Sequence, residues 1–384
     1  KYRNVGFESR IITEYRAGKR KHNLSGGIRL YTGTTTRVAD GKGTTGTEYD
    51  MTVIGNYPRD IKFVSHNAAA FVENIFRITN KLLIIPGVRY EWLEGSASGR
   101  NGYDVNGSEI LLQDVTRSRS FLLAGIGAEY HLTPGTEWYA NYSQAYRPIQ
   151  FANLQAPPTT DQVDPDLEDA KGYNIDLGYR GKLKDYLQFD VSGFILQYNN
   201  RVGTITPTGA TYRLITNVGN SSSKGFEGYA EFDFLRAFTK LKQSQLSVFA
   251  SYSYTNAKYS GDHKDAQTKG KKVENAPVNI LRTGVTGGFR QATLTLQVNY
   301  VGSTYSDANN TEKVSANGQT GLIPSYTVAD VSGTYKISKS CNLKAGINNV
   351  FDKTYFTRRA GGYPGPGALP ADGRTFFVSV GAKF

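Results

Sequence analysis

Five arginines lie where predicted strands meet long connections, and their chemistry is that of anion binding. A guanidinium binds a carboxylate through two parallel hydrogen bonds and keeps its charge at physiological pH. Side-chain amides in the same regions can add further contacts. The candidate binding residues are Arg37, Arg147, Arg201, Arg358 and Arg359, together with Gln150, Asn309 and Asn310. The alternative is that these arginines pair with carboxylates of the protein itself, such as Glu73, Glu91 or Asp190.

Sequence patterns for catalysis or metal binding are missing. There is no Gly-x-Ser-x-Gly, no Walker-type phosphate loop and no His-Glu-x-x-His. The four histidines are far apart, and the single Cys341 can form neither an intramolecular disulfide nor a cysteine metal cluster. The acidic stretch 161–169 lacks the glycine of a calcium loop and is expected to be solvated. We therefore expect no enzyme activity, no bound metal and no cofactor.

The net charge of +12 raises the question of nucleic-acid binding, but the basic residues are dispersed. Many lie in short predicted turns, and they form no basic stripe with interleaved aromatic residues. We therefore expect no nucleic-acid partner. Mean hydropathy is −0.44, and no apolar run approaches the roughly 20 residues of a transmembrane helix. A search for long apolar runs does not detect a membrane β-barrel, because only every second residue of its strands faces lipid.

Alternation of apolar and polar residues is the dominant pattern. Leu294, Leu296, Val298 and Tyr300 alternate with Thr, Gln and Asn, and 376–384 and 246–255 show the same period of two. The pattern predicts about fifteen strands of roughly ten or more residues, close to the length that crosses a bilayer. The expected spans are 4–18, 23–38, 66–79, 82–97, 118–132, 136–150, 171–183, 186–201, 212–236, 244–258, 277–289, 292–306, 325–337, 341–356 and 373–384. The span 212–236 is too long for one plain strand and is expected to include a loop.

Short and long connections alternate along the chain. The short ones are 18–22, 79–81, 133–136, 181–185, 287–291 and 337–340, and the long ones are about 40–65, 98–117, 151–170, 259–276, 305–324 and 357–372. Bacterial outer-membrane barrels have short periplasmic turns and long extracellular loops, whereas a soluble sandwich has no reason to sort its loops in this way. The sequence therefore predicts an all-β, antiparallel transmembrane β-barrel in contact with the lipid bilayer of the bacterial outer membrane.

The number of strands indicates an incomplete barrel. The first and the last predicted strands both run toward the short-turn end, so the count is odd, whereas complete single-chain bacterial barrels have an even number. About fifteen strands match the last part of a 22-strand barrel, the plugged transporter class. Residues 1–384 are thus expected to be one barrel portion, with the plug and the first strands outside this chain.

Several stretches resemble TonB-dependent receptors of the outer membrane. Residues 343–356, LKAGINNVFDKTYF, resemble the penultimate strand and the N-[LIV]-F-D-x-x-Y element of that family. Residues 373–384 resemble its closing strand with a terminal aromatic, 139–148 with 164–168 resemble its F-R-P…N-P-x-L stretch, and 224–227 resemble its K-G-x-E element. The resemblance implies active uptake of a scarce nutrient, energised by the TonB–ExbB–ExbD complex through a plug and TonB box. It also implies insertion by the barrel-assembly machinery.

A narrower resemblance is to receptors for ferric citrate. It rests on residues 306–324 and on 355–358, and it implies that the candidate arginines and amides bind a ferric chelate. The stretch after Arg359 departs from that pattern, because AGGYPGPG has no Asn where the subfamily presents one. The alternatives are uptake of another nutrient by the same family, a passive porin, or a structural barrel that holds a partner protein.

The resemblance of the last strand generates a prediction for Phe384. Closing strands of this kind resemble those that the barrel-assembly machinery recognises through a terminal aromatic residue. Phe384→Ser is expected to lower the amount of folded receptor in the outer membrane, measured as heat-modifiable protein on gels. An unchanged amount of heat-modifiable barrel would contradict this role as an insertion signal.

Overall fold

A computed structural model describes residues 1–39, 41–43, 52–149, 161–205, 213–241, 243–261, 268–360 and 366–383. Within these residues fifteen strands follow one another in one antiparallel sheet, each paired with the next along the path. Their bounds are β1 Tyr2–Ala17, β2 Arg20–Ala39, β5 Arg59–Arg77, β6 Leu82–Tyr103, β7 Glu109–Thr133, β8 Thr136–Arg147, β10 Ala170–Leu183, β11 Leu187–Ile205, β12 Arg213–Asp233, β13 Ser244–Gly261, β14 Asn279–Phe289, β15 Ala292–Val301, β18 Tyr326–Lys336, β19 Cys341–Asn348 and β22 Thr375–Ala382. The predicted all-β fold, its strand order and its antiparallel pairing are confirmed.

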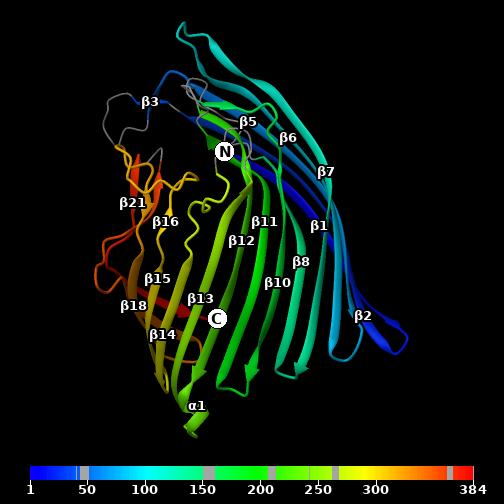
Figure 1. Ribbon diagram of the computed structural model, residues 1–384, viewed down its shortest axis with the longest axis vertical. Helices are drawn as coiled ribbons and strands as arrows, with labels where there is room; N and C mark the ends of the chain where they lie inside the picture. Colours follow the sequence, from blue (N-terminus) through cyan, green and yellow to red (C-terminus); the bar gives the residue numbers. More distant parts are fainter. Residues whose placement is uncertain are drawn as a thin grey trace.

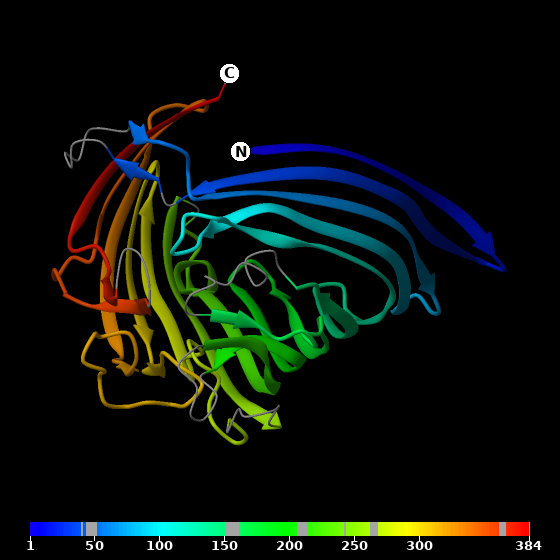
Figure 2. The ribbon, with the colours of Figure 1, turned by 90° about the horizontal axis from the view of Figure 1, so that it is seen from above.

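The sheet curls into a deep trough instead of a closed tube. Figure 1 shows the strands side by side, with short turns at the lower end and the larger connections at the upper end. Seen from above, the sheet forms an arc whose two edges, β1 and β22, border its open side (Figure 2). Within the described residues β1 pairs only with β2, and β22 pairs only with β19. The chain therefore forms the wall of a partial barrel.

Short extra elements decorate the connections. At the long-loop end, β9 Asp161–Val163 pairs in parallel with β12, and three two-stranded pieces form from β3 Lys42–Gly43 with β4 Val53–Ile54, β16 Thr304–Tyr305 with β17 Leu322–Ile323, and β20 Phe356–Ala360 with β21 Gly367–Pro370. At the short-turn end, the helix α1 Phe234–Phe238 connects β12 to β13. No helix among the described residues is long and apolar enough to cross a membrane.

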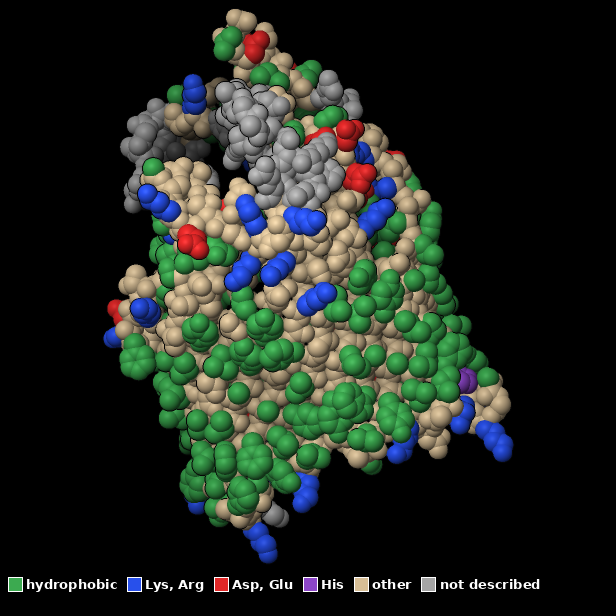
Figure 3. Space-filling view, in the orientation of Figure 1, with side chains coloured by type: hydrophobic (Ala, Val, Ile, Leu, Met, Phe, Trp, Pro, Cys, Tyr) green, Lys and Arg blue, Asp and Glu red, His purple; other side chains and the backbone are tan. Residues whose placement is uncertain are grey.

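The two faces of the sheet differ in chemistry, as the alternation predicts. Large apolar side chains lie exposed on the convex face, for example Leu122, Leu294 and Val378. Figure 3 shows such side chains as a broad band across the outer surface. The concave face is polar: Gln297 donates to Asn299 at 3.0 Å, and Asn299 donates to Asp330 at 3.0 Å. The apolar band matches hydrocarbon, and the polar wall matches a water-filled lumen.

Two of the predicted connections are too long because strands continue beyond the bilayer: 40–65, inside which β5 already begins at Arg59, and 98–117. The span 98–117 is no loop: β6 reaches Tyr103 and β7 begins at Glu109, so both strands form a hairpin that projects above the others (Figure 1). Bulges interrupt its pairing near Gly99 and Gly102, and Gly99 has φ of +119°. Outside hydrocarbon neither face must be apolar, so the alternation that marks a membrane strand fades there although the pairing continues.

The spans 212–236 and 341–356 also need correction. The first holds no internal loop in the described residues; β12 is one strand of 21 residues, and α1 follows it directly. In the second, β19 ends at Asn348, where the backbone turns away through Asn349, whose φ is +49°. Residues 350–356 therefore belong to the long connection, apart from the first residue of β20.

The two faces lead to a prediction for neighbouring residues of β15. Leu296 lies on the convex face between Val285 and Val331, near the middle of a strand of ten residues. Leu296→Arg is expected to cost about 2–4 kcal/mol of folding free energy, because the charge must enter hydrocarbon near the midplane. Gln297→Arg is expected to cost much less, since this side chain faces the lumen opposite Asp330. The measurement is urea unfolding of the receptor in lipid vesicles, and equal costs would show that the assignment of the faces is wrong.

Candidate functional site

Three of the long connections are tied together by side chains that the sequence singled out as binding candidates. Arg201 on β11 forms an ion pair with Glu274 at 3.0 Å. The Tyr259 hydroxyl donates to the other oxygen of the same carboxylate at 2.7 Å. Tyr259 lies near the outer end of β13, beyond the roughly ten residues that cross the bilayer. Burial raises the pKa of its phenol, and Glu274 raises that pKa further. Tyr259 therefore stays protonated and remains a donor to Glu274.

Asn309 and Asn310 join the β15–β18 connection to the β13–β14 connection. The Asn310 side chain accepts a hydrogen bond from the Lys272 backbone N–H at 2.7 Å and donates to the Lys272 carbonyl at 2.8 Å. The Lys271 ammonium donates to the Asn309 side-chain oxygen at 3.3 Å. Arg201 and the two asparagines thus all contact the short segment 271–274, and their polar groups are already engaged by protein atoms.

Arg359 and its neighbour Arg358 behave differently. Arg359 donates to the carbonyl oxygens of Gly318 at 3.0 Å and Leu322 at 3.1 Å, and so fastens β20 to the β15–β18 connection. Arg358 is exposed and makes no hydrogen bond or ion pair with any described residue. The expectation that Arg358 sits where a membrane strand meets a loop is wrong, because β19 ends ten residues earlier, at Asn348.

The remaining predicted residues lie apart from this group. The Arg147 guanidinium, at the end of β8, donates to the Tyr198 hydroxyl at 3.3 Å. Arg37 is exposed near the outer end of β2. Gln150 and Phe384 lie outside the described residues. The structure therefore brings Arg201, Asn309, Asn310 and Arg359 into one set of connected loops and leaves Arg37 and Arg147 on separate strands. Ligand contact by any of them stays a prediction.

The acidic stretch 161–169 was expected to be a solvated loop, but two of its carboxylates are bound by other parts of the wall. Asp164 is 2% exposed and accepts hydrogen bonds from the Thr216 hydroxyl and the Asp166 backbone N–H. Asp169 forms an ion pair with Arg119 of β7 and accepts from the Tyr146 hydroxyl of β8. The carboxylates serve as anchors that close the wall where β7 and β8 stop pairing, above Gly125.

A polar cavity on the concave wall is lined by none of the binding residues predicted from the sequence. It has a volume of about 620 Å³ and is lined by β14, β15, β18 and the β19–β22 connection, with Arg282 on one side. Arg282 makes no hydrogen bond or ion pair with any described residue and is exposed to the cavity. The rings of Tyr326 and Tyr355 stack at 4.4 Å beside it. Alternation in 277–289 could have revealed this arginine, because it is the one cation on the polar face of that stretch.

Asp330 lies in the wall of the same cavity and is held by neighbouring strands. Asp330 accepts from the Asn299 amide at 3.0 Å and from the Asn349 backbone N–H at 2.9 Å. Its hydrogen bonds hold the carboxylate against β15 and the start of the β19–β22 connection. Arg282 is therefore available for a bound anion, whereas Asp330 is fixed by neutral donors. The cavity offers one cation, Arg282, beside the carboxylates of Asp330 and Asp372, and it also has four side-chain amides and three tyrosines. The guanidinium and the amides are the groups that could bind a compact ligand with carboxylate groups.

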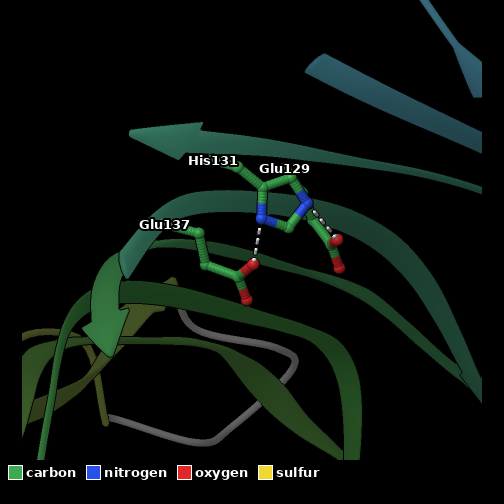
Figure 4. Close-up of side chains that lie close together, drawn as sticks. All are labelled: Glu129, His131 and Glu137. Carbon is green, nitrogen blue, oxygen red and sulfur yellow. Dashed lines mark ion pairs between the residues drawn. The ribbon is translucent and has the colours of Figure 1, made fainter. Parts of the chain in front are cut away.

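A second polar group lies at the short-turn end of the concave wall. Figure 4 shows His131 of β7 between Glu129 and Glu137, with His131 Nδ1 at 2.9 Å from Glu137 and Nε2 at 3.9 Å from Glu129. These three side chains could approach a metal ion together. Arg180 of β10, however, contacts Glu137 at 2.7 Å and Glu129 at 3.8 Å. Because this guanidinium already pairs with both carboxylates, we interpret the group as an ion-pair network.

Comparison with known proteins places this wall in a family. The chain matches the family described as TonB dependent receptor-like, beta-barrel, over residues 2–350. The chain belongs to this family. The family comprises transport receptors of the outer membrane, so the convex apolar band of this receptor barrel faces membrane lipid.

Relatives of this receptor barrel carry different names. It is 26% identical over 260 residues to the vitamin B12 transporter BtuB of Vibrio cholerae, covering 67% of this chain and 36% of the relative. It is 25% identical over 262 residues to the metal-pseudopaline receptor CntO of Pseudomonas aeruginosa, covering 66% and 32%. Among solved structures, the ferric citrate transporter FecA in its unliganded form has a TM-score of 0.80 at 24% identity, over 100% of this chain and 55% of that one. The chain thus spans about a third of these curated relatives, and they name no common cargo.

The contacts of Arg359 generate a prediction for the loops. Arg359→Ala removes two charge-assisted hydrogen bonds to carbonyl oxygens, each worth roughly 1.5–3 kcal/mol when protected from solvent and less at this partly exposed site. Amide hydrogen exchange in 315–322 is expected to become about tenfold faster, which corresponds to about 1.4 kcal/mol of local opening free energy. The measurement is hydrogen–deuterium exchange by mass spectrometry on the whole receptor.

Arg358→Ala is the matched control for this experiment. It removes an arginine side chain one residue earlier. Because Arg358 forms no hydrogen bond or ion pair with any described residue, this variant is expected to leave exchange in 315–322 unchanged. If both variants exchange like the wild type, the Arg359 contacts do not hold the β15–β18 connection.

Proposed function

We propose that this chain forms the barrel wall of a receptor that takes up a ferric chelate across the bacterial outer membrane. Uptake is driven by the TonB–ExbB–ExbD complex, acting through a plug and TonB box that belong to the rest of the receptor. The single observation that carries the choice of cargo is Arg282, an exposed cation that forms no hydrogen bond or ion pair with any described residue, in a polar lumen cavity. Membership of the transport-receptor family supports the mode of uptake.

The size of the cavity, its guanidinium and its side-chain amides are the basis for proposing a small anionic chelate, which would bind beside two carboxylates of the wall. The cavity volume of about 620 Å³ is in the ordinary range for small-molecule sites. An anion that enters the cavity must lose water, and a fixed guanidinium with neighbouring amides can replace that hydration. Tyr355 lines the cavity and belongs to the stretch 355–358 that resembles ferric citrate receptors. We therefore propose ferric citrate, or a chelate with similar carboxylates, as the cargo.

Long-range attraction plays no part in this proposal. The long connections contain ten Lys and Arg residues against sixteen Asp and Glu residues. A mouth with this excess of negative charge does not steer an anion inward. Selectivity must then arise from short-range contacts inside the wall, after the chelate has passed the loops.

The proposal predicts a loss of affinity when Arg282 is removed. A hydrogen bond to a charged group contributes roughly 1.5–3 kcal/mol, so Arg282→Ala is expected to weaken ferric citrate binding by about one to two orders of magnitude. Arg147→Ala and Arg358→Ala test the arginines predicted from sequence. The measurement is calorimetry with ferric citrate on the whole receptor.

Arg77→Ala is the control, because this guanidinium lies at the short-turn end and donates to the Lys21 carbonyl at 3.0 Å and to Asn23 at 2.7 Å. It is expected to bind ferric citrate like the wild type. A wild-type receptor that ignores ferric citrate and binds another ferric chelate would remove the citrate assignment. Radioactive iron uptake that is equal in cells with and without TonB would instead favour a passive porin.

A further inference from the structure

The short-turn end of the barrel carries an unusual charge. Its seven connections, bounded by the sheet strands, contain eight Lys and Arg residues and a single acidic residue, Asp185. The long connections at the other end have the opposite excess, with sixteen acidic and ten basic residues. Short turns at one end are the periplasmic turns of a bacterial barrel. The periplasmic rim is therefore strongly basic, and the extracellular rim is acidic.

The helix α1 gives this rim an apolar component that faces outward. Phe232 at the end of β12 packs against Phe234 and Phe238, with ring centroids 4.9 and 6.1 Å apart, and leaves Phe238 77% exposed. Asp233, buried beneath the helix, accepts from the Arg236 backbone N–H at 3.1 Å and so fixes the turn. Figure 3 shows the hydrophobic side chains gathered at this lower corner, with basic side chains just beyond them.

The same order of side chains recurs along the neighbouring turns. The turns after β12, β14 and β18 follow one another along the rim, because these strands are next but one in the sheet. Phe289 is 59% exposed, and the Arg290 guanidinium lies 5.1 Å from the centre of its ring. Ile337 is 55% exposed and precedes Lys339 by two residues. In each turn an apolar side chain continues the membrane band, and a cation follows at the water side.

We propose that these three turns bind the headgroups of anionic phospholipids in the periplasmic leaflet. Charge complementarity favours this occupant, since each Lys or Arg near an anionic lipid surface adds to binding. Depth favours it as well, because Phe238, Phe289 and Ile337 lie on the lipid face and place their cations at the level of the phosphates. A soluble anionic partner would not need those apolar side chains. The proposal is independent of which cargo the receptor carries.

The test compares two triple variants of the whole receptor purified in mild detergent. Lys240→Gln with Arg290→Gln and Lys339→Gln removes one exposed cation from each turn of the rim. Lys313→Gln with Lys353→Gln and Arg374→Gln removes three exposed cations from the long connections and is the matched control. Native mass spectrometry with equimolar phosphatidylglycerol and phosphatidylethanolamine measures which lipid is retained.

The wild type and the control are expected to retain phosphatidylglycerol preferentially. In the rim variant, the ratio of retained phosphatidylglycerol to retained phosphatidylethanolamine is expected to fall by about tenfold or more. Equal retention of the two lipids by the wild type would overturn the proposal. An equal loss in both triple variants would do the same, because it would reduce the effect to overall charge. Heat-modifiable migration on gels verifies that each variant is folded.

A second measurement does not depend on the stability of the charge variants. Phe238→Trp places a fluorophore at the exposed tip of α1, and its signal is the difference from the wild-type receptor, in which this chain contributes two Trp residues. In mixed vesicles, brominated phosphatidylglycerol is expected to quench this signal more strongly than brominated phosphatidylethanolamine at the same mole fraction. Equal quenching by the two lipids would overturn the site.

Discussion

A backbone N–H or carbonyl inside hydrocarbon must find its hydrogen-bond partner within the protein, because no water is present to replace it. This constraint determines the architecture of the chain. Each strand pairs with its neighbour along the path from β1 to β22, and the turns at one end are short enough to keep consecutive strands adjacent. Within the described residues β1 and β22 are the two edges of the sheet, where this constraint is not met by a neighbouring strand. Lipid exposure on one face and water on the other then require the alternation seen in β15.

Because alternation follows directly from this constraint, the sequence revealed the strands, their number and their direction. It failed where the constraint ends. The hairpin of β6 and β7 continues as paired backbone outside the membrane without an apolar face, so no periodic signal marks 98–117 as strand. Asn349, in the left-handed region, ends β19 before the residues that looked like its continuation. Long-range contacts such as Asp169 with Arg119 join residues fifty positions apart, and no local pattern announces them.

The candidate site shows the same limit at the level of single side chains. Residue type identified arginines and amides near the loops. It could not distinguish a side chain that is hydrogen-bonded to other parts of the protein from one that is available to bind a ligand. Arg359 and Asn310 bind backbone carbonyl and N–H groups of other loops, whereas Arg282 of β14 faces the cavity. That distinction depends on which loop lies next to which strand. The related receptors differ in their named cargo at similar identity, so family membership leaves the same question open.

The side chains that join the three long connections have a consequence for how this receptor can be altered. Arg201, Asn310 and Arg359 each contact a segment other than their own, so the described parts of the connections after β13, β15 and β19 are joined to one another. An exchange of one connection between relatives would leave the other connections with donors and acceptors that no longer match. Grafting a new specificity onto this barrel therefore calls for moving the three segments as one unit, together with the outer end of β11 that carries Arg201.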